Sequence, residues 1–362
     1  MRSPMPSCPP VVTRVRALTF EEASKQIAPM ARVSYVQLER GPAWVHGSIA
    51  RSNGVVIARL GGTRNRIVRV ESAPGRLLIV VGTRGTARVG TSAIGASDAV
   101  VLNRATDLVA FCDSRFLSVA ISVEQQALEQ ALADLRLDVR KTADNVRVLQ
   151  LSGEQLHDLM GIAREVFESE SDPLIPAALS AAAVEDLLLR WCAASLRNQP
   201  ERRHGIGAAA ARRRAALRAR EFVDTHLDQP LSLAIVCRAS YTSARALEYG
   251  FRELFELSPM AYVRLARLSR VRRDLCAPNG HATVTQFAGK WGFGHLGQFS
   301  KDYYALFGEL PSATLSRAAA RADTQPVTPQ SERTRPRTLD GSVARSSAAR
   351  RTDEDSYRAS LA

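Results

Sequence analysis

The chain has 362 residues, enough for two domains and a tail, and 45% of them are hydrophobic, so sizeable cores can form. Its formal net charge of +13 favours a polyanionic partner. No apolar run is long enough to span a membrane, and the proline-rich first twelve residues lack the apolar segment of a signal peptide. We therefore expect a cytoplasmic protein without membrane contact, whose five scattered cysteines are reduced.

The N-terminal half is predicted to be β-rich. Residues 1–16 are expected to be disordered. Between residues 32 and 121, short runs of β-forming residues alternate with glycines, which predicts a small barrel or sandwich. The predicted strands are 54–60, 66–70, 76–81, 99–103, 107–112 and 116–121. A hairpin turn is predicted at 82–85, where no Gly-Lys-Ser/Thr follows to make a phosphate-binding loop.

Helices are expected to follow the strands. Ser122, with Gln125 three residues later, is a candidate capping box, and Ser152 with Gln155 opens a helix to about Phe167. An alanine- and leucine-rich helix follows within 177–196. It could cover the barrel or pair with its copy in a dimer, and the sequence leaves both open. These helices close a sensing or dimerisation domain at 17–197, followed by a linker at 198–211.

Two segments of one kind organise the C-terminal half. Residues 231–259 and 284–311 each contain a short apolar helix, a break, and a second helix with large apolar residues at i, i+4 and i+8. These apolar residues are Leu247, Phe251 and Phe255 in the first segment, and Phe299, Tyr303 and Phe307 in the second. Residues 205–317 carry 16 Lys and Arg against 9 Asp and Glu. The pattern predicts two helix-turn-helix units in a basic domain.

Residues 211–315 resemble the DNA-binding domain of the AraC/XylS family of bacterial transcription regulators. The resemblance is carried by Pro259-x-x-Tyr262, Arg267-Leu268, Leu275, Gly292-Phe293, Phe299, Phe307-Gly308 and Pro311. It implies an α+β chain, with a cupin-like N-terminal domain and an all-α DNA-binding domain at 212–317. The tail at 318–362 is expected to be disordered, because it has almost no large apolar residues. The implied function is sequence-specific regulation of transcription. Double-stranded DNA is the expected partner, while a small-molecule effector, a second copy of the chain and RNA polymerase stay open; no cofactor and no catalysis are expected.

The first unit carries candidate base-reading residues. Thr242 or Ser243 is the predicted cap of its second helix, and the outer face of that helix carries four polar side chains: Arg245, Glu248, Tyr249 and Arg252. The resemblance places base reading on the first three. Arginine can bond guanine N7 and O6 together, and glutamate can accept from cytosine N4. Alternatively, Arg245 and Glu248 pair with each other at i, i+3.

The second unit is poorer in such groups. Its turn ends at His295, a candidate helix cap or phosphate contact, and the groove-facing set is Leu296, Gly297, Ser300 and Lys301. Lys301 and Ser300 suit phosphate, and Leu296 suits a thymine methyl. We therefore expect the first unit to read sequence and the second mainly to position the protein.

The connecting helix is predicted to begin at Ser258-Pro259 and to hold the two units in successive major grooves, about 34 Å apart. Arg267 on this helix is interpreted as structural. Tyr241 stands where many family members have glycine, and tyrosine disfavours positive φ. Either this turn takes another conformation or Ser240 carries the strain.

The sequence also bears on two other functions. A cupin-type metal enzyme is disfavoured because only His46 of six histidines lies in the β-rich region, and no H-x-H or H-E-x-x-H spacing occurs. A non-specific architectural DNA binder, driven by charge, predicts equal affinity for scrambled sequences. The C-terminal tail is expected to be solvated.

Overall fold

The structure, a computed structural model, describes residues 11–52, 54–103, 107–134, 146–168, 181–196, 208–277 and 282–324. The expected disordered N-terminus, linker and tail lie mostly outside these ranges. Where they meet the described residues, the boundaries differ: strand β1 already begins at Val11, helix α5 at Ala208, and helix α11 runs on to Thr324. The alanines at 318–320 are strong helix formers, which explains why the last helix continues.

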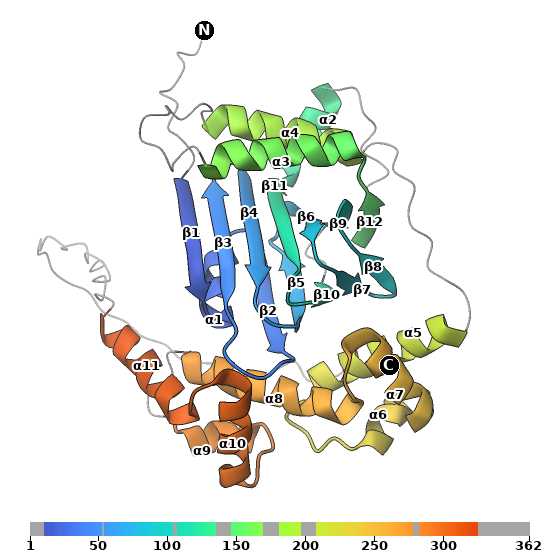
Figure 1. Ribbon diagram of the computed structural model, residues 1–362, viewed down its shortest axis with the longest axis vertical. Helices are drawn as coiled ribbons and strands as arrows, with labels where there is room; N and C mark the ends of the chain where they lie inside the picture. Colours follow the sequence, from blue (N-terminus) through green and yellow to red (C-terminus); the bar gives the residue numbers. More distant parts are fainter. Residues whose placement is uncertain are drawn as a thin grey trace, which may run out of the picture. The chain divides into compact units, whose positions relative to one another are not determined.

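The β-rich half forms two antiparallel sheets in the described part of the chain (Figure 1). The larger sheet has the order β1 (Val11–Leu18), β3 (Val45–Arg51), β4 (Val55–Gly62), β11 (Leu117–Glu124), β6 (Arg76–Arg84), β9 (Asp98–Leu102) and β12 (Val146–Gln150). The smaller sheet has the order β2 (Ala31–Gln37), β5 (Arg66–Ser72), β10 (Asp107–Cys112), β7 (Ala87–Val89) and β8 (Ser92–Ile94). All six predicted strands are present, but β6 continues through the predicted turn, which instead falls at Gly85 with φ of 71°.

The larger sheet is buried on both faces because its strands are apolar at successive positions. On β11, Val119 and Ile121 belong to one core while Ala120 between them belongs to the other, as the alternation of side chains along a strand requires. The first core lies under helices α2 (Gln125–Asp134), α3 (Gly153–Glu168) and α4 (Ala181–Leu196). The second core also takes in α1 (Phe20–Ile27) and lies between the sheets.

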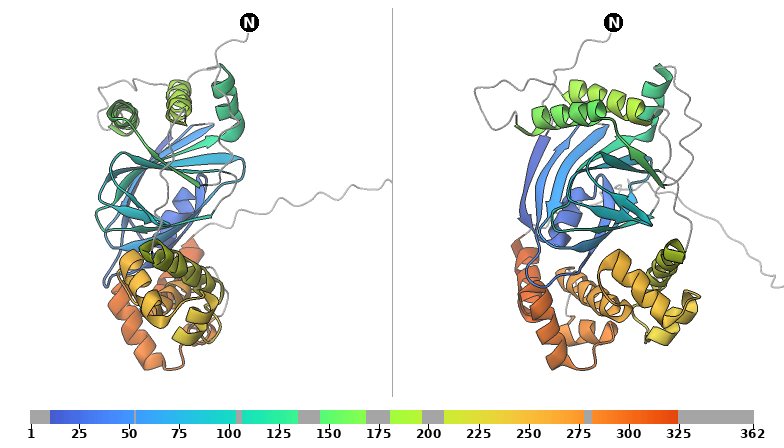
Figure 2. Two further views of the ribbon diagram at one scale, coloured as in Figure 1. Left: turned by 90° about the vertical axis from the view of Figure 1, so that its right-hand side faces the viewer. Right: turned by 45° about the vertical axis from the view of Figure 1, so that its right-hand side comes forward.

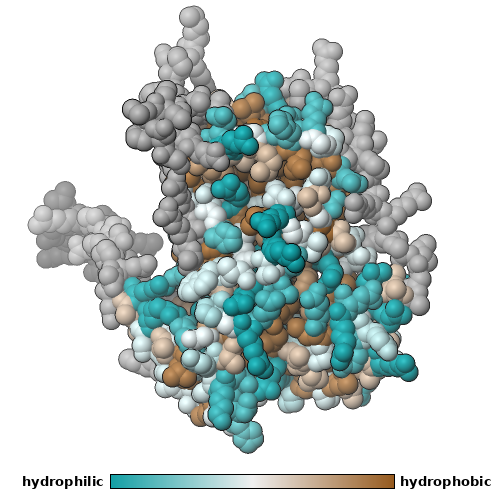
Figure 3. Space-filling model, viewed as in Figure 1, coloured by the Kyte–Doolittle hydropathy of each residue, from teal (hydrophilic) through white to brown (hydrophobic). Residues whose placement is uncertain are grey.

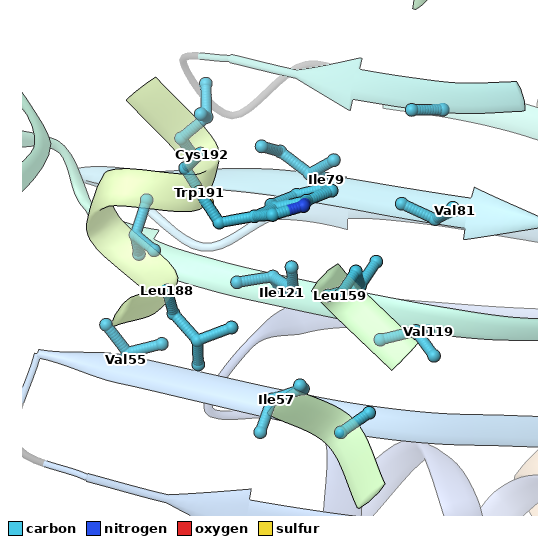
Figure 4. Packing of buried hydrophobic residues seen from close by; sticks show 14 of the residues in the cluster. Val55, Ile57, Ile79, Val81, Val119, Ile121, Leu159, Leu188, Trp191 and Cys192 are labelled. Carbon is cyan, nitrogen blue, oxygen red and sulfur yellow. The ribbon is translucent and has the colours of Figure 1, made fainter. Parts of the chain in front are cut away.

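Helices α3 and α4 lie side by side across the larger sheet (Figures 1 and 2). Leu188, Trp191 and Cys192 of α4 pack against Ile79 and Ile121 of the sheet (Figure 4). The prediction that this helix covers the barrel is therefore confirmed, whereas its pairing with a second copy stays a prediction.

One predicted helix start is confirmed and one is wrong. The Ser152 hydroxyl accepts from the Gln155 amide at 3.1 Å, and the Gln155 side chain accepts from the Ser152 amide at 2.9 Å, so the capping box opens α3. Ser122, in contrast, is a fully buried residue of β11. Pairing of β11 with β4 and β6 keeps the backbone extended through this position, and α2 begins only at Gln125.

The C-terminal half is helical, with bounds α5 (Ala208–Thr225), α6 (Leu233–Ala239), α7 (Ala244–Phe255), α8 (Pro259–Cys276), α9 (Val284–Lys290), α10 (Leu296–Phe307) and α11 (Pro311–Thr324). All six residues of the predicted apolar faces are buried, at 7% exposure or less. The two units have separate cores, and α8 contributes to both: Tyr262 and Ala266 to the first, Val271 and Leu275 to the second. Among the helices that the structure describes, none combines the length and apolar character needed to cross a bilayer.

Candidate nucleic-acid interface

The first helix-turn-helix unit is α6 followed by α7. Ser243 is the N-cap of α7, and its hydroxyl accepts from the Ala246 amide at 3.3 Å, which settles the choice between Thr242 and Ser243. Neither expectation about the turn holds. Ser240 has φ of −98° and is buried, with its hydroxyl donating to the Val236 carbonyl at 2.7 Å. Tyr241 itself takes the left-handed conformation, with φ of 53°.

The outer face of α7 presents the four predicted side chains. Arg245 is exposed, and its guanidinium carbon lies 5.8 Å from the centre of the Tyr249 ring. Glu248 lies 3.7 Å from the Arg252 guanidinium, so the expected alternative pairing with Arg245 is wrong. Among the described residues no salt bridge joins Arg245 to a carboxylate, and the residue is exposed. A guanidinium in this state is suited to a guanine edge or a phosphate.

In the second unit, α9 followed by α10, the turn residue with positive φ is a glycine. Gly292 has φ of 78°, and a Cβ there would lie 2.9 Å from an Nη atom of Arg267, so only glycine fits without displacing that side chain. His295 is the N-cap of α10, but its side chain makes no capping bond. Leu296, Gly297 and Lys301 are exposed and Ser300 is half-buried, so the predicted face does reach the surface.

Arg267 of α8 is structural, as predicted. Its Nε donates to the Leu227 carbonyl at 2.9 Å and one Nη to the Gln229 carbonyl at 2.6 Å, both in the connection between α5 and α6. Partial burial lowers the pKa of this guanidinium. Because the same side chain lies against Gly292, it ties the α5–α6 connection to the turn of the second unit.

A buried polar group fixes α5 on α8. The Tyr262 hydroxyl donates to an Asp224 carboxylate oxygen at 2.5 Å, and Arg220 lies 3.2 Å from the same carboxylate. Burial raises the pKa of both Asp224 and Tyr262. The arginine compensates the buried charge, so the packing of α5, which supports α7, depends on this group.

Residues of the β-rich half contact the C-terminal ends of both α7 and α10. Arg88 donates to the Leu254 carbonyl at 3.2 Å. The buried Gln37 amide donates to the Leu306 carbonyl at 2.6 Å, and the Gly41 amide donates to Ala305 at 3.1 Å. Sequence reasoning missed these contacts because no local pattern links residues more than 160 positions apart. Through these hydrogen bonds, residues of the β-rich half contact both α7 and α10 directly.

Two cavities are relevant to ligand binding. One, of about 120 Å³, lies within the β-rich half and is apolar except for a few polar groups, including Tyr35, Arg66 and Cys112. Burial raises the pKa of the Tyr35 phenol to about 12 and that of the Cys112 thiol to about 11. A second cavity, of about 320 Å³, is bordered by α1, β2, α5 and α8 and has five cationic side chains in its lining: Lys25, Arg69, Arg220, Arg270 and Arg273.

Residues 236–317 match the family model described as a helix-turn-helix domain. Over 96 residues the chain is 36% identical to the probable thc operon regulatory protein of Rhodococcus erythropolis, and over 98 residues 36% identical to the XylDLEGF operon transcriptional activator 3 of Pseudomonas putida. The C-terminal domain is an AraC-type helix-turn-helix domain.

These matches cover 26% and 27% of this chain, and the chain spans only 29% and 30% of the two relatives. Among solved structures, a probable AraC family transcriptional regulator from Rhodopseudomonas palustris is 32% identical, covering 29% of this chain and 96% of that one, with a TM-score of 0.28. The similarity to the two regulators is therefore one of the DNA-binding domain.

In the view of Figure 3, hydrophilic side chains gather over the C-terminal helices.

Proposed function

We propose that the protein is a transcription regulator that binds a specific DNA site with α7 and α10 in successive major grooves. One observation carries this proposal. Both helices expose the face opposite their buried aromatic residues, and both are held by the single helix α8, which contributes to both cores. No catalytic step is part of the proposed function.

Within this interface, we propose that α7 reads bases through Arg245, Glu248 and Tyr249, with Ser243 and Arg252 nearby. Arg245 is supported by its exposure and by its lack of an acidic partner in the described part of the chain. For α10 we propose that five residues position the protein on the DNA: His295, Leu296, Gly297, Ser300 and Lys301. Among them only Lys301 carries a fixed positive charge, which suits a phosphate contact rather than base reading.

The test is a titration of the full-length protein against DNA upstream of its own coding sequence and against scrambled duplexes of the same composition. Specific binding predicts a preference of about a thousandfold or more, and a footprint with two protected segments one helical turn apart. Equal affinity for both duplexes would support the architectural alternative instead.

We further propose that a small apolar effector binds the 120 Å³ cavity of the β-rich half. A cavity of similar size in another protein binds benzene, so a ligand of that scale fits without rearrangement. Contacts from this half to the ends of α7 and α10 supply a route by which occupancy changes DNA affinity.

Phenol is a suitable probe, because its ring matches the apolar walls and its hydroxyl the few polar groups. Phenol should raise the melting temperature of the wild-type protein by mass action. Ala110→Leu, which fills the cavity, should abolish this rise, while Ala313→Leu on exposed α11 should preserve it. If the filled variant still responds, the ligand binds elsewhere, and the cation-lined cavity becomes the next candidate.

A further inference from the structure

Tyr241 combines a disfavoured backbone with an exposed side chain. Its φ of 53° lies in the left-handed region, where a side chain clashes with its own backbone and glycine is preferred. Its exposure is 88%, the highest among the exposed large hydrophobic residues in the described ranges. The corresponding position of the second unit is Gly292, with φ of 78°. The same turn is therefore made once with glycine and once with tyrosine.

No hydrogen bond or ring contact among the described residues offsets the cost of a tyrosine side chain at this φ. The backbone amide of Tyr241 donates to the Arg238 carbonyl at 3.2 Å, a bond that glycine would make equally well. Its side chain forms no hydrogen bond and no ring contact with any described residue. A residue that is strained and exposed, and whose side chain gains no hydrogen bond or ring contact among the described residues, points to a contact outside the molecule.

The position of Tyr241 indicates which contact this is. It lies two residues before Ser243, the N-cap of α7, and four before Arg245. An open groove is lined by Arg238, Tyr241 and Ser243 together with residues of α6. In helix-turn-helix complexes the first helix crosses the DNA backbone while the start of the second meets base edges. The turn between them therefore lies beside the phosphates.

We propose that Tyr241 contacts the DNA backbone next to the base pairs that α7 reads, with its hydroxyl donating to a phosphate oxygen and its ring against a deoxyribose. This inference rests on the proposed DNA-binding function and adds a contact to it. Tyrosine carries no charge at neutral pH, and backbone contacts carry no base information. The contact therefore adds affinity for every sequence without adding specificity.

The decisive variant is Tyr241→Gly, for which stability and affinity should change in opposite directions. Relief of the strained φ should raise the melting temperature by about 2–4 °C. Loss of the side chain should weaken binding to matched and scrambled duplexes alike, by about tenfold. The dependence of log K on log salt should keep its slope, because no charge is removed.

Two further variants distinguish the loss of the DNA contact from the relief of backbone strain. Tyr241→Phe keeps the ring and the backbone conformation, so it should weaken DNA binding while leaving the melting temperature unchanged. Ser97→Gly removes a similar strain, φ of 72°, in the β-rich half. It should raise the melting temperature without changing DNA affinity.

Each other outcome overturns the assignment. If Tyr241→Gly binds DNA within twofold of wild type, Tyr241 is not a DNA contact. If its melting temperature falls, the strain argument is wrong. These results are distinct from failure of the proposed function itself, in which the wild-type protein would show no preference for a matched duplex.

Discussion

The two helix-turn-helix units share a buried framework and differ on their exposed faces. Both place three large side chains at i, i+4 and i+8 against a common helix, and all six are buried. The outer face of α7 carries two arginines, a glutamate and a tyrosine, whereas the predicted groove-facing set of α10, Leu296, Gly297, Ser300 and Lys301, offers one lysine among small and apolar residues. The buried positions therefore define a shared scaffold, and the exposed positions distinguish the two units.

The turns of the two units also differ. The first unit uses Tyr241 and a capping Ser243, and the second uses Gly292 and His295, whose side chain makes no capping bond. The unit with the more polar outer face thus has the more strained turn and the better-capped helix. We expect the first unit to contribute most of the sequence preference and the second to contribute affinity.

The largest expected effect comes from removing an aromatic residue from either core. Phe251→Ala and Phe299→Ala should each cost about 3–5 kcal/mol, because both side chains are almost fully buried. Since the two cores are separate, hydrogen exchange should show loss of protection centred on α7 for the first variant and on α10 for the second. Leu296→Ala, an exposed position, serves as the control. Uniform loss of protection in both variants would mean that the units do not unfold separately.

The next effect distinguishes reading from positioning. Arg245→Ala should lose about 1–3 kcal/mol on the matched duplex and relax the preference at one base pair, with a smaller loss on scrambled DNA. Arg245→Lys keeps the charge but not the paired hydrogen bonds, so it should lose specificity while largely retaining non-specific affinity. Equal losses on both duplexes would place Arg245 among the phosphate contacts.

Substitutions at the N-caps of α7 and α10 test the contrast between the turns of the two units. Ser243→Ala should destabilise the first unit by about 1 kcal/mol, because the Ala246 amide loses its acceptor. His295→Ala should change stability by less than about 0.5 kcal/mol, and His295→Ser should stabilise the second unit by up to about 1 kcal/mol. Denaturant titrations measure all three. A large loss in His295→Ala would reveal a role for this side chain in the fold.

The smallest effect concerns Lys301. Lys301→Ala should weaken matched and scrambled duplexes equally and lower the slope of log K against log salt by about one unit. Ser300→Ala, at the neighbouring position, should leave the slope unchanged. A change in base preference for Lys301→Ala would contradict the positioning role of α10.

Much of the C-terminal domain could be predicted from the sequence because its information is local. Leu247, Phe251 and Phe255 repeat with the period of a helix, so their spacing indicates which face of the helix is buried. The identity of the outward-facing residues follows as the complement of this set. Their roles stay proposals, since exposure alone does not distinguish a base contact from a solvated side chain.

The β-rich half was less predictable because its strands depend on partners far away in sequence. Ser122-x-x-Gln125 and Ser152-x-x-Gln155 have the same local pattern, yet only the second caps a helix, since β11 is paired on both sides. Helix α1 could have been found, because Thr19 and Glu22 form a capping box that the sequence displays. The contact from Gln37 to Leu306 had no such signal.

Arg267 has a consequence for how such domains diversify. Its guanidinium holds two carbonyls of the α5–α6 connection while occupying the space that keeps Gly292 a glycine. Recombination that exchanged the second unit alone would separate its turn from Arg267, and recombination that exchanged the α5–α6 connection would remove the acceptors of this arginine. The two units are therefore expected to be inherited as one block, while single exposed residues on α7 and α10, which make none of these contacts, remain able to vary.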